Sequence, residues 1–257
     1  MNVEQVALQL YTLRDHLKTP EDIRATLKRV REIGYQAVQV SGMGPIPEAE
    51  LVAILKDLDI TLCATHEPGA TILDDPAAIV DRMQKLGCAL TAFPHPGKVP
   101  MGSLEEVRDL ARRLNDSGRV LHEAGITLTY HNHSTEFKRV GGKTILEILY
   151  AETSPDYVQG EIDTYWVQHG GGNSEEWCRA LKGRLPILHL KDYVINAENQ
   201  PTFCEVGAGN LNWPGIIAAA EDSGCQWFAV EQDRCPGDAF DSVTQSFEYI
   251  RDHLCSA

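Results

Sequence analysis

The sequence predicts an α/β protein of the (βα)8 TIM barrel class, built as a single domain. Short runs rich in Val, Ile, Leu and aromatic residues alternate with amphipathic stretches, which is typical of βα units and a parallel sheet. Eight such units follow one another within 257 residues, and a closed barrel needs that number of units and about 250 residues. An open doubly wound sheet is the alternative, but residues 12–15 are not the glycine-rich phosphate turn that such sheets often carry after their first strand.

The eight candidate strands are short apolar segments, each followed by polar residues or by the start signal of a helix. Many of their residues are β-branched or aromatic, and such side chains favour extended backbone. In chain order, the expected strands are residues 6–12, 37–40, 61–66, 89–93, 126–133, 158–166, 186–193 and 227–233.

The eight candidate helices carry start and stop signals. The first begins at Pro20 with two acids in its first turn and stops at Gly34, and its apolar residues recur three and four positions apart on one face. The fifth opens with a capping box at Ser103. The helices are expected at residues 20–34, 47–58, 77–86, 103–125, 144–152, 174–183, 211–224 and 241–254. No linker or low-complexity segment divides the chain, so we expect residues 1–257 to form one domain.

Composition argues against several classes of protein. Lys and Arg total 23 against 37 Asp and Glu, a net charge of −14 without a basic patch, so nucleic acid and anionic membranes are poor partners. No apolar run approaches the roughly 18 residues of a transmembrane helix, and we expect no signal peptide. The seven cysteines are odd in number and form no CxxC pair, which predicts reduced thiols and a cytoplasmic location.

Ionisable residues gather where the expected strands end, which in a barrel of this class is the face that carries the active site. Six of the nine histidines lie at or just past strand ends, and this clustering favours a functional site over scattered surface positions. The residues concerned are His66, Glu67, His95, His131, His133, Glu136, Asp163, His169, His189, Lys191, Asp192, Glu231 and Asp233.

Carboxylates and an imidazole that converge from the last four strands predict a site for a divalent cation. Such ligands suit Mn²⁺ best, with Mg²⁺, Co²⁺, Fe²⁺ or Zn²⁺ as alternatives. Asp163, His189 and Glu231 could each be a satisfied polar group at the barrel rim. As a set at matching strand depths, they favour metal ligation.

Motifs along nearly the whole chain resemble the xylose isomerase-like TIM barrels, the family of sugar phosphate isomerases and epimerases. The motifs are LQLYTLRD, LTYHNHSTEF, EIDTYWVQHGGGN, LHLKDY and VEQD. The same architecture serves ketose 3-epimerases, inosose dehydratases, enzymes that process 3-keto-glycosides and abasic-site endonucleases. The resemblance implies a metal set of Glu, Asp, His and Glu, which on this chain is Glu136, Asp163, His189 and Glu231. His131 or His133 is the alternative to Glu136.

The resemblance implies a metal-dependent isomerase or epimerase of carbohydrate metabolism that acts on a keto sugar or sugar derivative through an enediolate. Glu136 and Glu231 would exchange the proton, and Lys191 would polarise a substrate oxygen or donate a proton. Substrate hydroxyls would be bound by His66, His131 and His133, which are also alternative acid–base groups. Tyr165 and Trp166 would form an apolar wall for the sugar ring, with barrel packing as the alternative.

Three other functions compete with this interpretation. A lyase or dehydratase acting on a keto-inositol or 3-keto-glycoside would use the same metal site. An abasic-site endonuclease is disfavoured by the net charge of −14, and a sugar-binding barrel without catalysis by the intact Asp163, His189 and Glu231 set. The glycine-rich segments 170–173 and 207–210 are candidate phosphate turns, but we expect ordinary turns and a substrate without phosphate. A homo-oligomer is possible by analogy alone.

Overall fold

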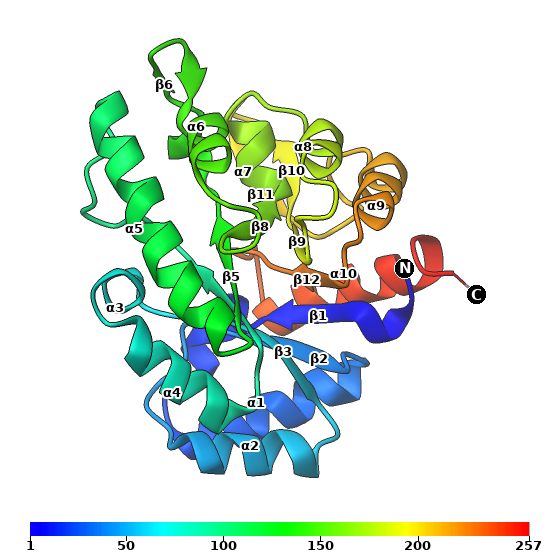
Figure 1. Ribbon diagram of the computed structural model, residues 1–257. Helices are drawn as coiled ribbons and strands as arrows, with labels where there is room; N and C mark the ends of the chain where they lie inside the picture. The colour runs from blue at the N-terminus through cyan, green and yellow to red at the C-terminus, as the bar shows by residue number, and fades with distance from the viewer. Residues whose placement is uncertain (257) are drawn as a thin grey trace.

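Eight parallel strands close into a barrel, and helices cover its outside (Figure 1). This computed structural model describes residues 1–256. Strands neighbour one another in the order β1-β2-β3-β4-β5-β8-β9-β12, with β12 paired to β1. Their bounds are β1 Val6–Gln9, β2 Ala37–Val40, β3 Thr61–His66, β4 Leu90–Phe93, β5 Thr127–His131, β8 Gln159–Asp163, β9 Ile187–Leu190 and β12 Trp227–Val230. The prediction of a single (βα)8 TIM barrel is confirmed.

The helices begin and end close to the predicted signals. Eight of them are α1 (Pro20–Ile33), α2 (Glu48–Asp57), α4 (Pro76–Leu86), α5 (Leu104–Glu123), α6 (Ile145–Glu152), α8 (Ser174–Ala180), α9 (Trp213–Asp222) and α10 (Ala239–His253). The predicted capping box is present, since the Ser103 hydroxyl accepts a hydrogen bond from the Glu106 amide at 3.2 Å. Two short helices that the sequence did not predict are α3 (Gly69–Asp74) and α7 (Thr164–His169).

Several strands end earlier than predicted, because polar side chains at their ends start other structures. The Asp163 carboxylate accepts a hydrogen bond from the Trp166 amide at 3.0 Å and caps α7, so residues 164–166 are helical and not part of a strand. After β1 the chain enters a 3-10 helix, Leu10–His16. After β9 it forms an unpredicted hairpin of β10 (Asp192–Ile195) and β11 (Pro201–Cys204). A second small hairpin joins β6 (Arg139–Val140) and β7 (Lys143–Thr144).

The barrel interior changes from apolar to polar along the strands. Side chains two positions apart on a strand point the same way, so successive layers can be read from the sequence numbers. Near the start of the strands a small apolar cluster includes Ala7, Ala37, Ile187 and Ala229. Two residues further along the same strands are Gln9, Gln39, His189 and Glu231, all buried. The polar layer therefore lies at the C-terminal end of the barrel, inside an apolar shell of strands and helices.

The two ends of the described chain lie near each other at the edge of the barrel (Figure 1). The Met1 carbonyl accepts a hydrogen bond from the Ser256 amide at 2.9 Å. Among the helices of residues 1–256, none combines the length and the apolar character needed to cross a membrane.

Candidate functional site

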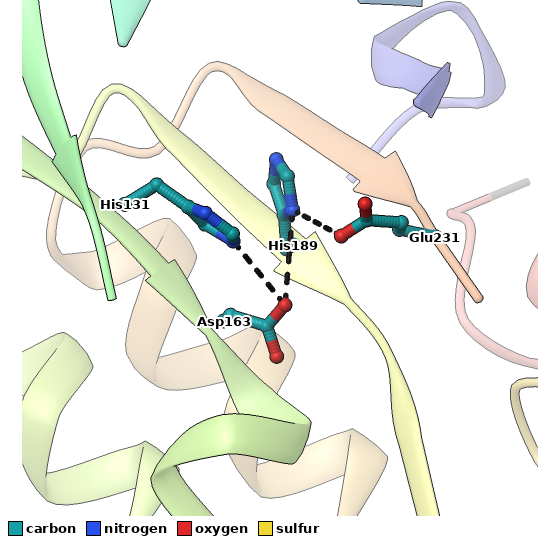
Figure 2. Close-up of side chains that lie close together, drawn as sticks. All are labelled: His131, Asp163, His189 and Glu231. Atoms are coloured by element: carbon teal, nitrogen blue, oxygen red, sulfur yellow. Dashed lines mark hydrogen bonds and ion pairs between the residues drawn. The ribbon is translucent and has the colours of Figure 1, made fainter. Parts of the chain in front are cut away.

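Four buried side chains meet at the ends of β5, β8, β9 and β12 (Figure 2). One nitrogen or oxygen atom from each of His131, Asp163, His189 and Glu231 lies within 4.8 Å of those of the other three. His131 Nε2 is 3.3 Å from Asp163 Oδ2, and His189 Nδ1 is 3.0 Å from Glu231 Oε2. We refer to these four residues as the His/acid group.

Parallel pairing of neighbouring strands sets the common depth of this group. Asp163 on β8 is the register partner of His189 on β9. His189 in turn is the partner of Ala229 on β12, and Glu231 follows two residues later on the same side of the strand. One oxygen of Asp163, Oδ1, caps α7, which leaves Oδ2 for the group.

Lys191 places an ammonium group directly beside the two carboxylates. Its Nζ lies 3.0 Å from Asp163 Oδ2, 2.8 Å from Glu231 Oε2 and 3.1 Å from Asp233 Oδ1, although its side chain is only 1% exposed. Burial opposes the charge, but the three acids outweigh burial and raise the pKa of Lys191 above its ordinary value. Burial likewise opposes the charge of Glu231, yet Lys191 and His189 hold the pKa of Glu231 well below the ordinary range.

Glu161, which our sequence analysis did not select, lies in the layer beneath the His/acid group. Its carboxylate accepts hydrogen bonds from Gln39 and Thr129, each at 3.1 Å, and also contacts His66 Nε2. It is fully buried. Glu161 precedes Asp163 by two residues on β8, so the two-residue period of a strand was the signal that could have found it.

Glu161 also decides which nitrogen His189 presents to the group. His189 Nε2 lies 2.9 Å from Glu161 Oε1 and 2.7 Å from Gln39 Oε1, and both oxygens are acceptors, so Nε2 carries the hydrogen. His189 Nδ1 therefore points toward Asp163 and Glu231. Burial opposes protonation of the ring, but Glu161 and Glu231 raise the pKa of His189 to about 10. A carboxylate behind a histidine in this manner is a common arrangement at metal sites.

The His/acid group fits a divalent cation. Two imidazole nitrogens and two carboxylate oxygens are donors that Mn²⁺, Fe²⁺, Co²⁺ and Zn²⁺ accept, and separations within 4.8 Å suit coordination of one ion. Charge agrees with this, because the carboxylates of Asp163, Glu231 and Asp233 surround one lysine and that of Glu161 lies beneath them against His189. Buried charge of one sign needs compensation, and a divalent cation would supply it.

Glu136 is not brought into the group, contrary to our expectation. After β5 the chain turns into a 3-10 helix, Ser134–Phe137, and Glu136 lies in it. Its Oε1 accepts a hydrogen bond from the Tyr130 hydroxyl at 2.9 Å, and its Oε2 accepts one from the His133 amide at 2.8 Å. His131, which the sequence analysis gave as an alternative, holds the fourth place.

A cavity of about 610 Å³ opens onto the group. Of the predicted substrate-binding residues, His66, His131, His133 and Trp166 line it, and so does Glu231. Tyr165 lies behind the wall, where its ring packs on Phe203 at 4.1 Å between centroids. Six lining residues were not predicted as members of the site: Tyr11, Arg14, Ser41, Pro94, Phe203 and Arg234.

Two polar atoms of the cavity wall have no partner within the protein. Among residues 1–256, three buried side-chain polar atoms lack a hydrogen-bond partner, and His133 Nδ1 and Trp166 Nε1 are two of them. The rings of these two residues are 5.5 Å apart. Buried polar atoms are rarely left unpaired, so this part of the cavity is prepared to bond a polar ligand.

The two glycine-rich segments are ordinary turns, as the sequence analysis expected. The amides of Gly207 and Gly209 donate to Asp192 Oδ2 at 2.9 and 3.2 Å, and the amide of Gly171 donates to the Gln168 carbonyl at 3.0 Å. Since these donors are used internally, neither turn offers a cradle for phosphate. Asp192 also accepts from the Trp213 indole, so this strand-end acid anchors a loop and does not face the cavity.

The fold and the His/acid group together are typical of barrel enzymes. In that class the active site lies at the C-terminal ends of the strands, where the buried histidines and carboxylates of this chain are found. A family model described as "Xylose isomerase-like TIM barrel" matches residues 27–253, and the chain belongs to that family. Members of this family include isomerases, epimerases and dehydratases that act on small sugar substrates.

Curated and solved relatives agree with this membership. An inosose dehydratase of Mesomycoplasma hyopneumoniae is 23% identical over 263 residues, which cover 88% of this chain and 86% of the relative. The crystal structure of a sugar phosphate isomerase/epimerase from Parabacteroides distasonis matches with a TM-score of 0.84 at 23% identity, covering 99% and 96% of the two chains. A family protein of Mycobacterium smegmatis in complex with magnesium matches with a TM-score of 0.74 at 15% identity, covering 96% and 95%.

Proposed function

We propose that this protein removes the proton next to the carbonyl of a keto sugar or keto-inositol and then eliminates water, as a metal-dependent lyase or dehydratase. The supporting observation is that the carboxylates and the histidines of the cavity wall come from different strands. Both carboxylates that line it, Glu231 and Asp233, follow β12, whereas His66, His95 and His133 line it from the ends of β3, β4 and β5. A base on one side and imidazoles on the other suit removal of a proton and protonation of a leaving group.

Each residue of the site has its own role in this reaction. Glu231 takes the proton from the carbon next to the carbonyl, and the electron pair forms the enediolate. The β-hydroxyl leaves as water with a proton that a cavity imidazole relays from solvent, since burial lowers the pKa of His133 to about 2 and keeps its ring neutral. The product is an unsaturated ketone. Lys191, kept charged by its three acids, stabilises negative charge near Glu231. The indole N–H of Trp166 has no partner within the described part of the chain and can donate a hydrogen bond to a substrate hydroxyl.

His131, Asp163, His189 and Glu231 would hold the metal ion. A bound divalent cation would supply Lewis-acid stabilisation of the charge that develops on the carbonyl oxygen. We expect Mn²⁺, and the magnesium in the Mycobacterium smegmatis relative supports a divalent cation in this family. The inosose dehydratase relative supports elimination as the outcome.

The second candidate is the isomerase or epimerase that the sequence motifs favoured. In that reaction an imidazole returns the proton to carbon, and no hydroxyl leaves. The resemblance to the Parabacteroides distasonis isomerase/epimerase supports it. Only one of the two glutamates that we expected to exchange the proton, Glu231, belongs to the group, because Glu136 bonds Tyr130 and His133.

Product analysis in heavy water tests both candidates. The purified protein with Mn²⁺ is incubated with 2-keto-inositol, a 3-keto-glucoside and D-fructose, and products are followed by NMR and ultraviolet absorbance. We expect an unsaturated ketone from one of the first two. A deuterium-labelled epimer or isomer without elimination would establish the second candidate, and exchange that persists in Glu231→Gln would contradict the role of Glu231 in both.

A further inference from the structure

Two arginines line the cavity without an acidic partner. Arg14 lies in the 3-10 helix after β1, and Arg234 lies in the segment after β12. In the described part of the chain, nine of the fourteen arginines have a carboxylate oxygen within 4.0 Å. Arg14 and Arg234 do not, and neither do Arg29, Arg139 and Arg184, which do not line the cavity. In a protein with a net charge of −14, cations left without acids at the mouth of one cavity are unexpected.

Arg14 is fixed in place by neutral groups. Its Nη1 donates to the Tyr11 carbonyl and its Nη2 to the Asp233 carbonyl, each at 2.9 Å. The guanidinium carbon lies 4.3 Å from the centre of the Tyr11 ring. These contacts use two of the five N–H donors of the guanidinium and leave its charge without a bonded acid. A guanidinium held rigidly loses little entropy when it binds an anion.

The acids nearest to Arg14 are engaged elsewhere. Asp233 offers Arg14 only its backbone carbonyl, because its carboxylate bonds Lys191 at 3.1 and 3.2 Å. Asp15 pairs with Lys18 at 3.3 Å. The fold therefore pairs each of these acids with a lysine, whereas the two arginines line the cavity without a bonded acid.

We propose that Arg14 and Arg234 form an anion subsite that binds a carboxylate or phosphate group of the substrate. The inference rests on the proposed function and deepens it. Among the keto sugars that the site accepts, it favours one that carries an anion, either a keto sugar acid or a sugar phosphate. Its carbonyl would lie at the His/acid group and its anionic end at the rim formed by β1 and β12. Guanidinium groups bind both anions through paired charge-assisted hydrogen bonds.

Equilibrium binding of three matched probes tests the subsite. D-fructose is neutral, 5-keto-D-gluconate carries a carboxylate, and D-fructose 6-phosphate carries a phosphate. Calorimetric titration of the magnesium-loaded protein at low salt is expected to show one anionic probe binding about tenfold or more tightly than fructose. We expect this preference to fall below about threefold in Arg14→Gln and in Arg234→Gln. The charge-matched control is Arg139→Gln, which removes a guanidinium outside the cavity that donates to the Gly142 carbonyl.

The probes also separate the possible results. Whichever anionic probe binds more tightly identifies the group as a carboxylate or a phosphate. The proposal would be overturned if all three probes bound equally, if neither anionic probe bound, or if the preference survived both cavity variants. It would also be overturned if Arg139→Gln lost the preference for the anionic probe to the same extent. Arg234 makes no hydrogen bond that its loss would break, so its variant remains informative if Arg14→Gln is unstable. Binding needs no turnover, so a failed exchange test in Glu231→Gln would leave this result interpretable.

Discussion

Two segments of this barrel, residues 132–137 after β5 and residues 231–234 after β12, each carry a buried glutamate. Glu136 accepts hydrogen bonds from the Tyr130 hydroxyl and the His133 amide, both from its own segment or the strand before it. Glu231 instead shares one oxygen between Lys191 and His189, which come from β9 and the residues just after it. Burial raises the pKa of Glu136, whereas neighbouring cations lower that of Glu231 despite its burial.

The difference leads us to propose that Glu136 is a structural carboxylate and Glu231 a functional one. Local neutral donors bond both oxygens of Glu136, so it holds the turn after β5 in shape. Glu231 is surrounded by ionisable groups from other strands, and it lines the cavity. Burial alone does not distinguish the two acids, but the origin and charge of their partners does.

Replacing each glutamate by glutamine gives the largest expected contrast. Loss of the general base in Glu231→Gln should lower the rate of exchange at the substrate carbon by about 10²–10⁴-fold. Glu136→Gln should keep the rate within about tenfold of the unmodified protein, because its carboxylate bonds the Tyr130 hydroxyl and the His133 amide and no member of the His/acid group. Deuterium incorporation measured by NMR checks both, and equal losses in the two variants would remove the distinction.

Removal of divalent cations is the next largest effect. Dialysis against a chelator should lower activity roughly 10²-fold or more, and it should lower the melting temperature because a bound ion stabilises the folded state. Restoring Mn²⁺ or Mg²⁺ should recover both quantities. Metal analysis by mass spectrometry provides the direct measurement. Full activity in a protein shown to be free of metal would refute the metal-dependent site.

The role of Glu161 in orienting His189 predicts a smaller loss. Glu161→Gln should weaken Mn²⁺ binding about 10–100-fold, since a carboxylate behind a histidine ligand fixes its ring and raises its basicity. Calorimetric titration with Mn²⁺ measures this, and Glu147→Gln is a matched control because Glu147 only caps α6 at Thr144. Unchanged affinity in Glu161→Gln would show that Gln39 alone positions the ring.

The smallest effect concerns stability and not catalysis. Glu136→Gln should lower the free energy of unfolding by about 1–3 kcal/mol, because one of its two buried donors loses a charged acceptor. Urea unfolding followed by circular dichroism measures the change. A stability equal to that of the unmodified protein would mean that the turn after β5 does not depend on this acid.

Much of the fold and about half of the site followed from patterns along the chain. Alternating apolar runs and helix caps such as Ser103 predicted the barrel, since both depend on neighbours within a few residues. Asp163, His189 and Glu231 were found because each stands at a strand end. The hairpin of β10 and β11 was missed, because residues 192–193 were assigned to the preceding strand and only their pairing with β11 shows that they belong to a separate sheet.

The sequence by itself determined the number of βα units, the face that carries the polar residues and three members of the His/acid group. Those properties depend on the two-residue period of strands and on capping, which are local. Only the tertiary structure decided that His131 stands in place of Glu136, that Glu161 orients His189, and that Arg14 and Arg234 face the cavity. These outcomes depend on barrel closure and strand register, which bring together side chains as far apart in sequence as Arg14 and Asp233.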